Sequence, residues 1–429
     1  MDSPEGSTQQ GTTWQARFPI FFGWVIVGIV FLRSFASLAA IWSTSILSVP
    51  MKQDLGWSGS TIFLGITLRT LGAAAGSLFW GKHMDHPSRA RKLALGSGVI
   101  SALGLMLVSF VDSPWQFWAI YGVFGGILGA GPDALLTSAI VPKWFIRKRG
   151  RAVALSSMGT GLAAFIMPLL VPPFVSAFDW RPTFVALGVN TLILGVLPSF
   201  LLRTRPEDVG LRPDGDNADS ARQARSLPEV SYTAGQAFRT TTLWLLMGAA
   251  LFGSFSPTAF PTNLTPTLVD RGYSLKVAGW AFSAYGFTSF TGRFFWGWLA
   301  DKIHIRYTLL IICTYTGLTI PLLRLLPGDM VLAAGGIAGF GIGGYVGLNQ
   351  VVWATYFGRE NLGAITGKVR PMITLSQAWA TTIIAGIADL TGGHGTGIVL
   401  MAATWWGSVA FLSRVKPVKV AKATELTTA

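Results

Sequence analysis

The segment Gly76-Ser-Leu-Phe-Trp-Gly-Lys-His-Met-Asp85 recurs farther along the chain as Gly292-Arg-Phe-Phe-Trp-Gly-Trp-Leu-Ala-Asp301. The two copies share five residue types at the same spacing, and both lie at the end of a long apolar stretch. A segment that recurs in equivalent places indicates a chain built from two related halves. The shared positions are Gly76, Phe79, Trp80, Gly81 and Asp85 in the first copy and Gly292, Phe295, Trp296, Gly297 and Asp301 in the second.

Apolar stretches long enough to cross a lipid bilayer surround both copies. Of the 429 residues, 51% are hydrophobic and only 12% are charged, whereas soluble domains average about 25% charged residues. A helix needs roughly 20 apolar residues to cross a bilayer, and no stretch alternates as membrane β-strands do. We therefore predict an all-α integral membrane protein with twelve transmembrane helices. They are expected at 20–47, 58–81, 93–112, 115–142, 150–178, 182–202, 240–269, 275–300, 306–326, 329–357, 363–390 and 395–413.

A polar segment divides the predicted helices into two sets of six. Residues 203–239 are rich in Asp, Arg, Pro, Ser and Gly and are too polar to cross a membrane, so we interpret them as a cytoplasmic linker. The predicted organisation is a disordered cytoplasmic N-terminus at 1–19, a six-helix bundle at 20–202, the linker, a second six-helix bundle at 240–413, and a cytoplasmic tail at 414–429.

The basic residues are distributed unevenly between the loops. The formal net charge is +14, and about 25 of the 33 Lys and Arg residues fall in alternate gaps, on the side of the linker. About five fall in the other gaps. Because positive loops stay in the cytoplasm, this asymmetry predicts a multi-pass protein of the plasma (cell inner) membrane with both termini cytoplasmic. The excess charge is therefore a topology signal and does not indicate a nucleic-acid partner.

The sequence offers no catalytic chemistry. We find no nucleophile paired with a base, no nucleotide-binding loop and no metal-ligand cluster, and the four histidines fall in predicted loops. Cys313 is the single cysteine, which excludes a disulfide within the chain. We therefore predict a protein that is not an enzyme, has no cofactor or metal, and works as a monomer.

Four charged residues fall inside predicted helices, where lipid penalises them. They are Arg33, Arg69, Asp133 and Arg293. Together they would cost about 10 kcal/mol if they faced lipid, which rivals the roughly 5–15 kcal/mol stability of a whole domain. We therefore expect them to face the protein interior. Three positive charges against one negative charge leave an excess that an anionic solute can neutralise.

The continuation of the first repeated copy resembles a known loop. Gly81 is followed by Asp85 and by a run of basic residues from Arg89, which is similar to the loop signature of the major facilitator superfamily, although His86 replaces its usual arginine. The resemblance implies two pseudo-symmetric six-helix bundles. Near the inner helix ends, this loop is expected to form a latch that holds one conformation. The latch residues are Gly81, Asp85, Arg89, Gly297 and Asp301.

Two further segments narrow the resemblance. Phe22-Gly-Trp-Val-Ile-Val27 is similar to the first-helix stretch of monocarboxylate porters and of their bacterial relatives, the oxalate:formate exchangers, although the acidic lead is absent. Trp144-Phe-Ile-Arg-Lys-Arg-Gly-Arg-Ala152 resembles the aromatic and basic stretch before their fifth helix. The resemblance implies a small carboxylate as substrate and an arginine in the eighth helix that binds it.

Arg293 matches this implied arginine. It lies about two helical turns before Asp301 and about one turn after Ser289, where members of the group often carry a polar or acidic residue. We predict that Arg293 binds the carboxylate, with Arg33, Arg69 and Ser289 in the same site, because a guanidinium donates two parallel hydrogen bonds and keeps its charge when buried. In the alternative, Arg293 bonds only to helix carbonyls or to Asp301.

Asp133 is the only acidic residue deep in a predicted helix of either half. Burial and a nearby arginine act in opposite directions on the proton affinity of a carboxyl group. We therefore predict that Asp133 couples transport to a proton as Arg33 or Arg69 changes its distance. In the alternative, a permanent ion pair between Asp133 and one of these arginines only holds helices together.

Polar residues at other predicted cavity positions complete the candidate substrate site. Tyr121 and Tyr345 resemble tyrosines of lactate-type porters. For each of the candidate hydrogen-bonding residues, the alternative role is packing in the protein core. Lys368 and Arg370, at the start of the eleventh predicted helix, are expected to meet lipid phosphate or to gate the cytoplasmic side. The candidate hydrogen-bonding residues are Tyr121, Tyr285, Tyr345 and Asn349.

These features predict a secondary active transporter that moves a small organic anion, a monocarboxylate such as lactate or pyruvate, with a proton by alternating access. One alternative is an antiporter that exchanges carboxylates or dicarboxylates against a counter-anion. Another is an exporter of a larger anionic metabolite or drug. A receptor built on a transporter scaffold is disfavoured because the linker and the tails are too short for an output domain.

Overall fold

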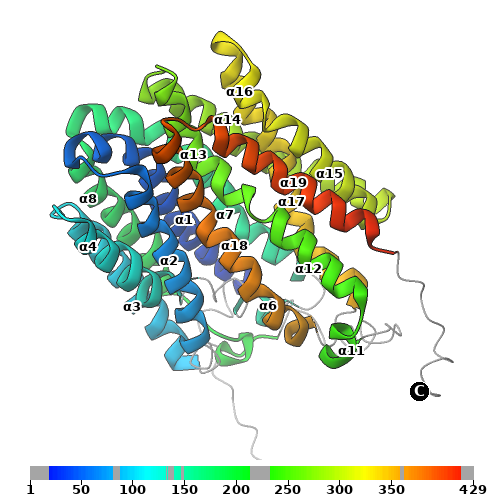
Figure 1. The fold of residues 1–429 in the computed structure, drawn as a ribbon. Helices are drawn as coiled ribbons and strands as arrows, with labels where there is room; N and C mark the ends of the chain where they lie inside the picture. Colours follow the sequence, from blue (N-terminus) through cyan, green and yellow to red (C-terminus); the bar gives the residue numbers. More distant parts are fainter. Residues whose placement is uncertain are drawn as a thin grey trace, which may run out of the picture.

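The computed structural model describes residues 19–80, 87–131, 133, 140–145, 149–212, 232–357 and 362–416. Within these ranges the chain is almost entirely helical and contains no strand. Nine helical stretches of the described residues, some of which combine consecutive elements, are long and apolar enough to cross a membrane. The long helices run alongside one another in a single bundle (Figure 1). The prediction of an all-α membrane fold is therefore confirmed.

The helices of the first half follow the predicted order. The fourth and sixth predicted spans contain wider π-type turns, and the short helix α6 precedes the fifth span. The elements are α1 (Phe22–Leu55), α2 (Gly59–Trp80), α3 (Pro87–Val108), α4 (Pro114–Phe117), η3 (Trp118–Ala130), α6 (Val141–Trp144), α7 (Arg149–Phe178), α8 (Trp180–Asn190), η5 (Thr191–Val196) and α9 (Leu197–Ser199), followed by η6 (Pro206–Val209).

The second half begins with a broken helix. Its first predicted span is divided into two helices at Ser254 and Phe255, just ahead of Pro257, because proline lacks the N–H that would continue the helical bonding. The elements are α11 (Ala234–Phe238), α12 (Thr241–Gly253), α13 (Ser256–Asp270), α14 (Leu275–Lys302), α15 (Ile305–Thr319), α16 (Leu322–Leu325), η8 (Gly328–Met330), α17 (Val331–Phe357), α18 (Leu362–Thr391) and α19 (Gly395–Arg414).

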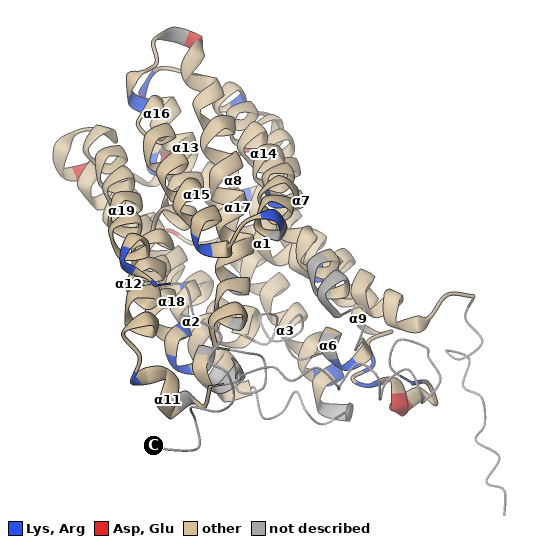
Figure 2. Ribbon diagram, turned by 90° about the vertical axis from the view of Figure 1, so that its right-hand side faces the viewer, with Lys and Arg blue, Asp and Glu red and all other residues tan. Residues whose placement is uncertain are grey.

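The outside of the bundle is apolar. Large apolar side chains of the helices point outward, and Phe124, Phe294 and Leu318 are exposed at 58%, 61% and 60%. Such extensive apolar exposure suits a surface covered by lipid. Lys and Arg segments surround α6 and α11 at one end of the bundle (Figure 2). We call this end, where the segments flanking the linker lie, the linker side.

The repeated segment makes the same contact in both halves. Gly76 on α2 packs against η3, and Gly292 on α14 packs against α17, so closely that a Cβ would collide with the carbonyl groups of Ile127 and Phe340, respectively. The tryptophan four residues after each glycine donates its indole N–H to that same carbonyl, at 3.1 and 3.0 Å. The sequence repeat therefore records one pseudo-symmetric helix contact, in which glycine permits the approach and tryptophan fixes it.

Candidate functional site

α2 and α18 join the two halves at the side of the bundle remote from the linker. The Thr67 hydroxyl donates to the carbonyl of Ala378 at 2.6 Å. Nearer the helix ends, the Asp389 carboxylate accepts hydrogen bonds from the backbone N–H groups of Gly59 and Ser60, at 3.2 and 2.8 Å. A carboxylate stabilises a helix N-terminus, and here the other half of the protein supplies it.

Two further helix pairs make extensive contacts between the halves, α1 with α13 and α7 with α14. The Ser45 hydroxyl donates to the carbonyl of Thr262, and the Ser283 hydroxyl donates to the carbonyl of Phe165 at 2.7 Å. Every hydrogen bond between the halves in the described ranges belongs to one set of residues, which we call the far seal. It consists of Ser45, Gly59, Ser60, Thr67, Phe165, Thr262, Ser283, Ala378, Thr382 and Asp389.

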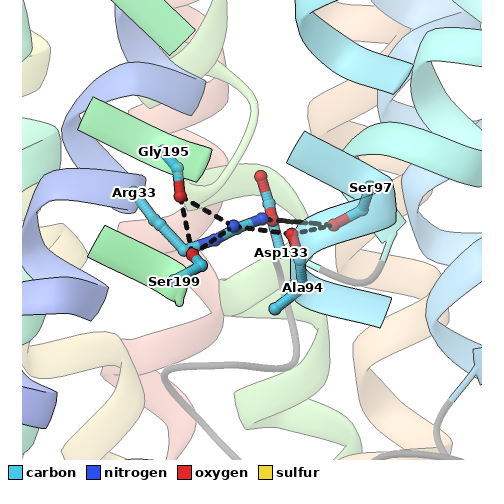
Figure 3. A network of polar contacts seen from close by, with 6 residues as sticks. All are labelled: Arg33, Ala94, Ser97, Asp133, Gly195 and Ser199. Carbon is cyan, nitrogen blue, oxygen red and sulfur yellow. Dashed lines mark hydrogen bonds and ion pairs between the residues drawn. The ribbon is translucent and has the colours of Figure 1, made fainter. Parts of the chain in front are cut away.

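Arg33 and Asp133 form a buried ion pair (Figure 3). Nη2 of Arg33 donates to the Asp133 carboxylate, and Nη1 donates to the carbonyls of Ala94 and Gly195 at 2.7 and 3.0 Å and to the Ser199 hydroxyl at 2.8 Å. The Arg33 side chain is 2% exposed, and that of Asp133 is 14% exposed. Of the two arginines expected near Asp133, Arg33 is therefore its partner, and the two charges neutralise each other.

Arg69 is buried without an acidic partner among the described residues. Its side chain is 3% exposed, and its guanidinium carbon lies 5.0 Å from the ring centroid of Tyr121. Its Nη1 reaches the Tyr121 carbonyl only at 3.5 Å, and its Nε has no hydrogen-bond partner within the described ranges. Gly125 makes room for it, since a Cβ there would lie 2.7 Å from Nη1. The ring of the buried Tyr121 therefore stabilises the positive charge of Arg69 through a cation–π contact.

A cavity of about 270 Å³ lies beside both of these arginines. It is on the linker side of the far seal, because Thr70 follows Thr67 by about one helical turn on α2, and Thr160 precedes Phe165 on α7. We call it the first-half cavity. Its polar wall consists of Arg33, Ser34, Ser37, Arg69, Thr70, Asp133 and Thr160.

Arg293 occupies the corresponding level of the second half. It lies on α14 about one turn beyond Phe290, which contacts Gly161 of α7, and therefore also on the linker side of the far seal. Arg293 is partly buried, and within the described ranges it has no acidic partner and its Nε has no hydrogen-bond partner. Its guanidinium lies near Tyr285, and both Tyr285 and Ser289 on the same helix are buried.

A second cavity, of about 450 Å³, lies among α12, α13, α17 and α18. Tyr345 and Asn349 of the predicted set line it, and Gln377 on its wall directly precedes Ala378 of the far seal. We call it the second-half cavity. Its wall consists of Ser254, Pro257, Tyr345, Val346, Asn349, Trp353, Val369, Arg370, Ile373 and Gln377.

The structure separates the two basic residues that the sequence places at the start of the eleventh helix. α18 begins at Leu362, about two turns before Arg370, and Arg370 lines the second-half cavity. Lys368 instead lies with its Nζ 5.5 Å from the ring centroid of Phe238 and is not part of the cavity wall.

Most of the predicted latch lies outside the described residues. Gly81 and Asp85 are not described, and neither are the side chains of Arg89 and Asp301. Gly297 lies on α14, where a Cβ would meet nothing within 4 Å. The latch, and the alternative pairing of Arg293 with Asp301, stay predictions.

Sequence reasoning missed several residues that complete these sites. Ser97 accepts a hydrogen bond from Nη2 of Arg33 at 3.1 Å, and Ser199 binds Nη1. Serines are frequent in the helices of this chain and carry no charge, so nothing in the sequence singles these two out. Trp353 and Gln377 are equally unmarked, because only the packing of α17 against α18 brings them to one cavity.

Two helical halves joined by the far seal, with polar cavities and buried arginines on its linker side, define a membrane transporter built from two bundles. The chain belongs to the Major Facilitator Superfamily, whose family model matches residues 29–381 and, in a second match, residues 258–425.

Similar proteins are transporters and not enzymes. Monocarboxylate transporter 12 of Mus musculus is 24% identical over 435 residues, which cover 94% of this chain and 87% of that protein. Monocarboxylate transporter 11 of Mus musculus is 24% identical over 396 residues, with coverage of 86% and 82%. Monocarboxylate transporter 13 of Bos taurus is 23% identical over 395 residues, with coverage of 89% and 86%. The chain is thus a secondary transporter related to the monocarboxylate transporters.

Solved structures share the fold at low sequence identity. A D-xylose–proton symporter superposes with a TM-score of 0.71 at 14% identity, covering 92% of this chain and 98% of that chain. A bacterial homologue of the human lysosomal transporter Spinster, in an inward-facing and unoccupied conformation, superposes with a TM-score of 0.64 at 16% identity, covering 93% and 95%. These likenesses establish the two-bundle fold.

Proposed function

We propose that the protein carries a small organic anion, a monocarboxylate such as lactate or pyruvate, together with a proton by alternating access. The observation that carries this proposal is the state of the buried arginines. Arg69 and Arg293 have no acidic partner within the described ranges, whereas Asp133 neutralises Arg33. The similarity to monocarboxylate transporters supports the same substrate class.

The electrostatic cost of these arginines favours an anionic solute. An uncompensated buried ion is penalised by several kcal/mol, and a carboxylate offsets this penalty by accepting two parallel hydrogen bonds from a guanidinium. A neutral sugar or a cationic drug leaves the positive field of Arg69 and Arg293 uncompensated. The substrate in this proposal binds on the linker side of the far seal, with Tyr285, Ser289, Tyr345 and Asn349 as the surrounding polar groups.

Asp133 is the proton site in this proposal. Its carboxylate is less buried than the Arg33 guanidinium and lines the first-half cavity, so a proton can reach it from that side. Protonation removes the charge that holds Nη2 of Arg33, and Arg33 then becomes available to the anion. Proton binding and anion binding thereby favour each other, which is the requirement for symport.

The far seal and the cavities support alternating access. The hydrogen bonds between the halves in the described ranges all belong to the far seal, and the first-half and second-half cavities lie on its linker side. A third cavity, of about 650 Å³, lies on its other side and is lined by residues of both halves, among them Lys52 and His394. The positive-inside rule assigns the linker side to the cytoplasm, with both termini there. We therefore interpret the conformation as open to the cytoplasm, in a protein of the plasma membrane. Transport then requires the far seal to open in turn.

Uptake into proteoliposomes tests the proposal. We expect purified protein to take up labelled lactate or pyruvate when a proton gradient is imposed, without any anion inside the vesicles. Labelled oxalate and formate serve as comparison substrates. Uptake that depends strictly on an internal anion would support the exchange alternative instead. Absence of uptake of all four anions under both conditions would contradict the proposal.

A further inference from the structure

Arg370 is the only charged residue on the described wall of the second-half cavity. Its side chain is exposed and has no ion pair or hydrogen bond with the described part of the chain. No acidic side chain of the described wall opposes it. A guanidinium in this position presents its full set of donors to whatever enters the cavity.

The two helices around Arg370 give the cavity a polar and an apolar component. Tyr345, Asn349 and Trp353 recur at intervals of four along α17 and therefore lie on one face of it. On α18, Arg370 shares a face with Ile373 and Gln377. Asn349 and Gln377 add amide groups to the cavity wall, and its apolar part consists of Pro257, Val346, Trp353, Val369 and Ile373.

The size of the cavity bears on the occupant. Its volume of about 450 Å³ falls within the range of roughly 300–1,000 Å³ that is typical of small-molecule sites. One water occupies about 30 Å³ of the liquid, so an acid of three carbons leaves most of this space filled by solvent. An apolar body next to the carboxylate fills this space and packs against the apolar side chains of the wall, among them Trp353 and Ile373.

We propose that the second-half cavity binds a monocarboxylate with an apolar tail, whose carboxylate is held by Arg370 and whose tail packs against Trp353. This inference rests on the proposed transport of organic anions and narrows its substrate class. It assigns substrate recognition to an arginine of α18, in addition to Arg293 of α14. Because Gln377 adjoins Ala378, an occupant of this cavity also lies next to the far seal.

Binding of phenylpyruvate and pyruvate to the purified protein, measured by isothermal titration calorimetry, tests this inference. We expect phenylpyruvate to bind more tightly than pyruvate. Arg370→Gln should weaken phenylpyruvate binding about tenfold to a hundredfold, the effect of losing hydrogen bonds to a charged group. Arg370→Lys, which keeps the charge and loses the fork, should weaken it less. Lys368→Gln is the matched control, since it removes the same charge two residues away, outside the cavity wall.

The tail is tested separately by Trp353→Ala, which should weaken binding of phenylpyruvate and leave that of pyruvate unchanged. Equal binding of phenylpyruvate by the unmodified protein, Arg370→Gln and Arg370→Lys would overturn the role of Arg370, and so would an equal loss in Lys368→Gln. If Arg370→Gln does not fold, the affinity of Arg370→Lys for phenylpyruvate tests the role of Arg370 by itself. If all of these variants take up carboxylates like the unmodified protein, only this inference is contradicted. If the unmodified protein neither binds nor transports any carboxylate, the proposed function is contradicted as well.

Discussion

At the scale of single residues, the interior arginines differ in how their charge is compensated. Arg33 has four different partner groups on other elements besides Asp133, namely two carbonyls and two serine hydroxyls. Arg69 makes a cation–π contact with the ring of Tyr121, and Arg293 lies near Tyr285. The three arginines therefore differ in how much of their charge the protein itself compensates. The least compensated ones, Arg69 and Arg293, are the best candidates for binding an anion.

Arg293→Lys should abolish the stabilisation of the protein by substrate. Lysine keeps the positive charge but cannot donate two parallel hydrogen bonds to a carboxylate, so we expect about a tenfold or greater loss of affinity. The measurement is the rise in melting temperature of purified protein when lactate or pyruvate is added. Arg414→Lys, at the end of α19, is the control and should behave like the unmodified protein. An undiminished rise in the Arg293 variant would rule out this residue as the carboxylate ligand.

Asp133→Asn should separate anion movement from proton movement. The amide keeps a hydrogen-bond acceptor for Arg33 but cannot exchange a proton at physiological pH. We expect exchange of labelled for unlabelled substrate across the vesicle membrane to continue, while uptake driven by a proton gradient is lost. Uptake in this variant that still follows the imposed proton gradient would remove Asp133 from the coupling mechanism and leave it a structural partner of Arg33.

At the scale of elements, the repeated segment shows why a helix keeps particular residues. Gly76 lets the backbone of α2 approach that of η3 closely, and Gly292 does the same for α14 and α17. The tryptophan that follows each glycine adds a hydrogen bond across the contact. In a membrane, where lipid is as apolar as the side chains, such close packing replaces the hydrophobic effect as the force between helices. This contact therefore explains why both repeated segments have a glycine followed four residues later by a tryptophan, a pattern that an apolar composition alone does not produce.

Gly292→Ala should destabilise the protein, whereas Gly297→Ala on the same helix should not. A Cβ at residue 292 collides with the Phe340 carbonyl, but a Cβ at residue 297 meets nothing within 4 Å. Overpacking of this kind costs about 1–3 kcal/mol, while replacing a helical glycine in open space by alanine is favourable by about 0.5–1 kcal/mol. Thermal unfolding in detergent measures both variants. Equal melting temperatures would contradict the assignment of the close contact.

At the scale of the whole molecule, the far seal determines which cavities are accessible. It joins three pairs of helices, one member of each pair from each half. Polar residues of the candidate site lie on the linker side of the far seal in α1, α2, α7, α14 and α18. A carrier that closes one side while exposing the site to the other needs such an arrangement, because a site open on both sides would dissipate the gradient.

Cross-linking the far seal should stop transport reversibly. The hydroxyls of Thr67 and Thr382 lie 2.6 Å apart across the halves, so cysteines at both positions are close enough to form a disulfide. In a Cys313→Ser background, we expect the oxidised Thr67→Cys, Thr382→Cys double variant to lose uptake and to regain it on reduction. Each single variant is the control. Full uptake by a completely cross-linked protein would show that the halves do not separate at this level.

Much of the fold could be predicted from hydropathy, because lipid forces each span to satisfy its own backbone hydrogen bonds as a helix. The predicted first helix at 20–47 is observed at Phe22–Leu55, and the predicted eighth at 275–300 is observed at Leu275–Lys302. The predicted span 240–269 is instead divided into α12 and α13 close to Pro257, a break that hydropathy does not register because both sides of it are apolar.

Sequence by itself determined that Arg33, Arg69, Asp133 and Arg293 had to lie inside the protein, because the cost of a charge in hydrocarbon depends only on the residue and its depth. It could not determine which arginine meets Asp133, nor that Arg370 lines a cavity while Lys368 does not. Those outcomes depend on how helices distant in the chain rotate and pack against one another. A side chain two residues farther along a helix points to a different neighbour, and only the tertiary structure decides which neighbour that is.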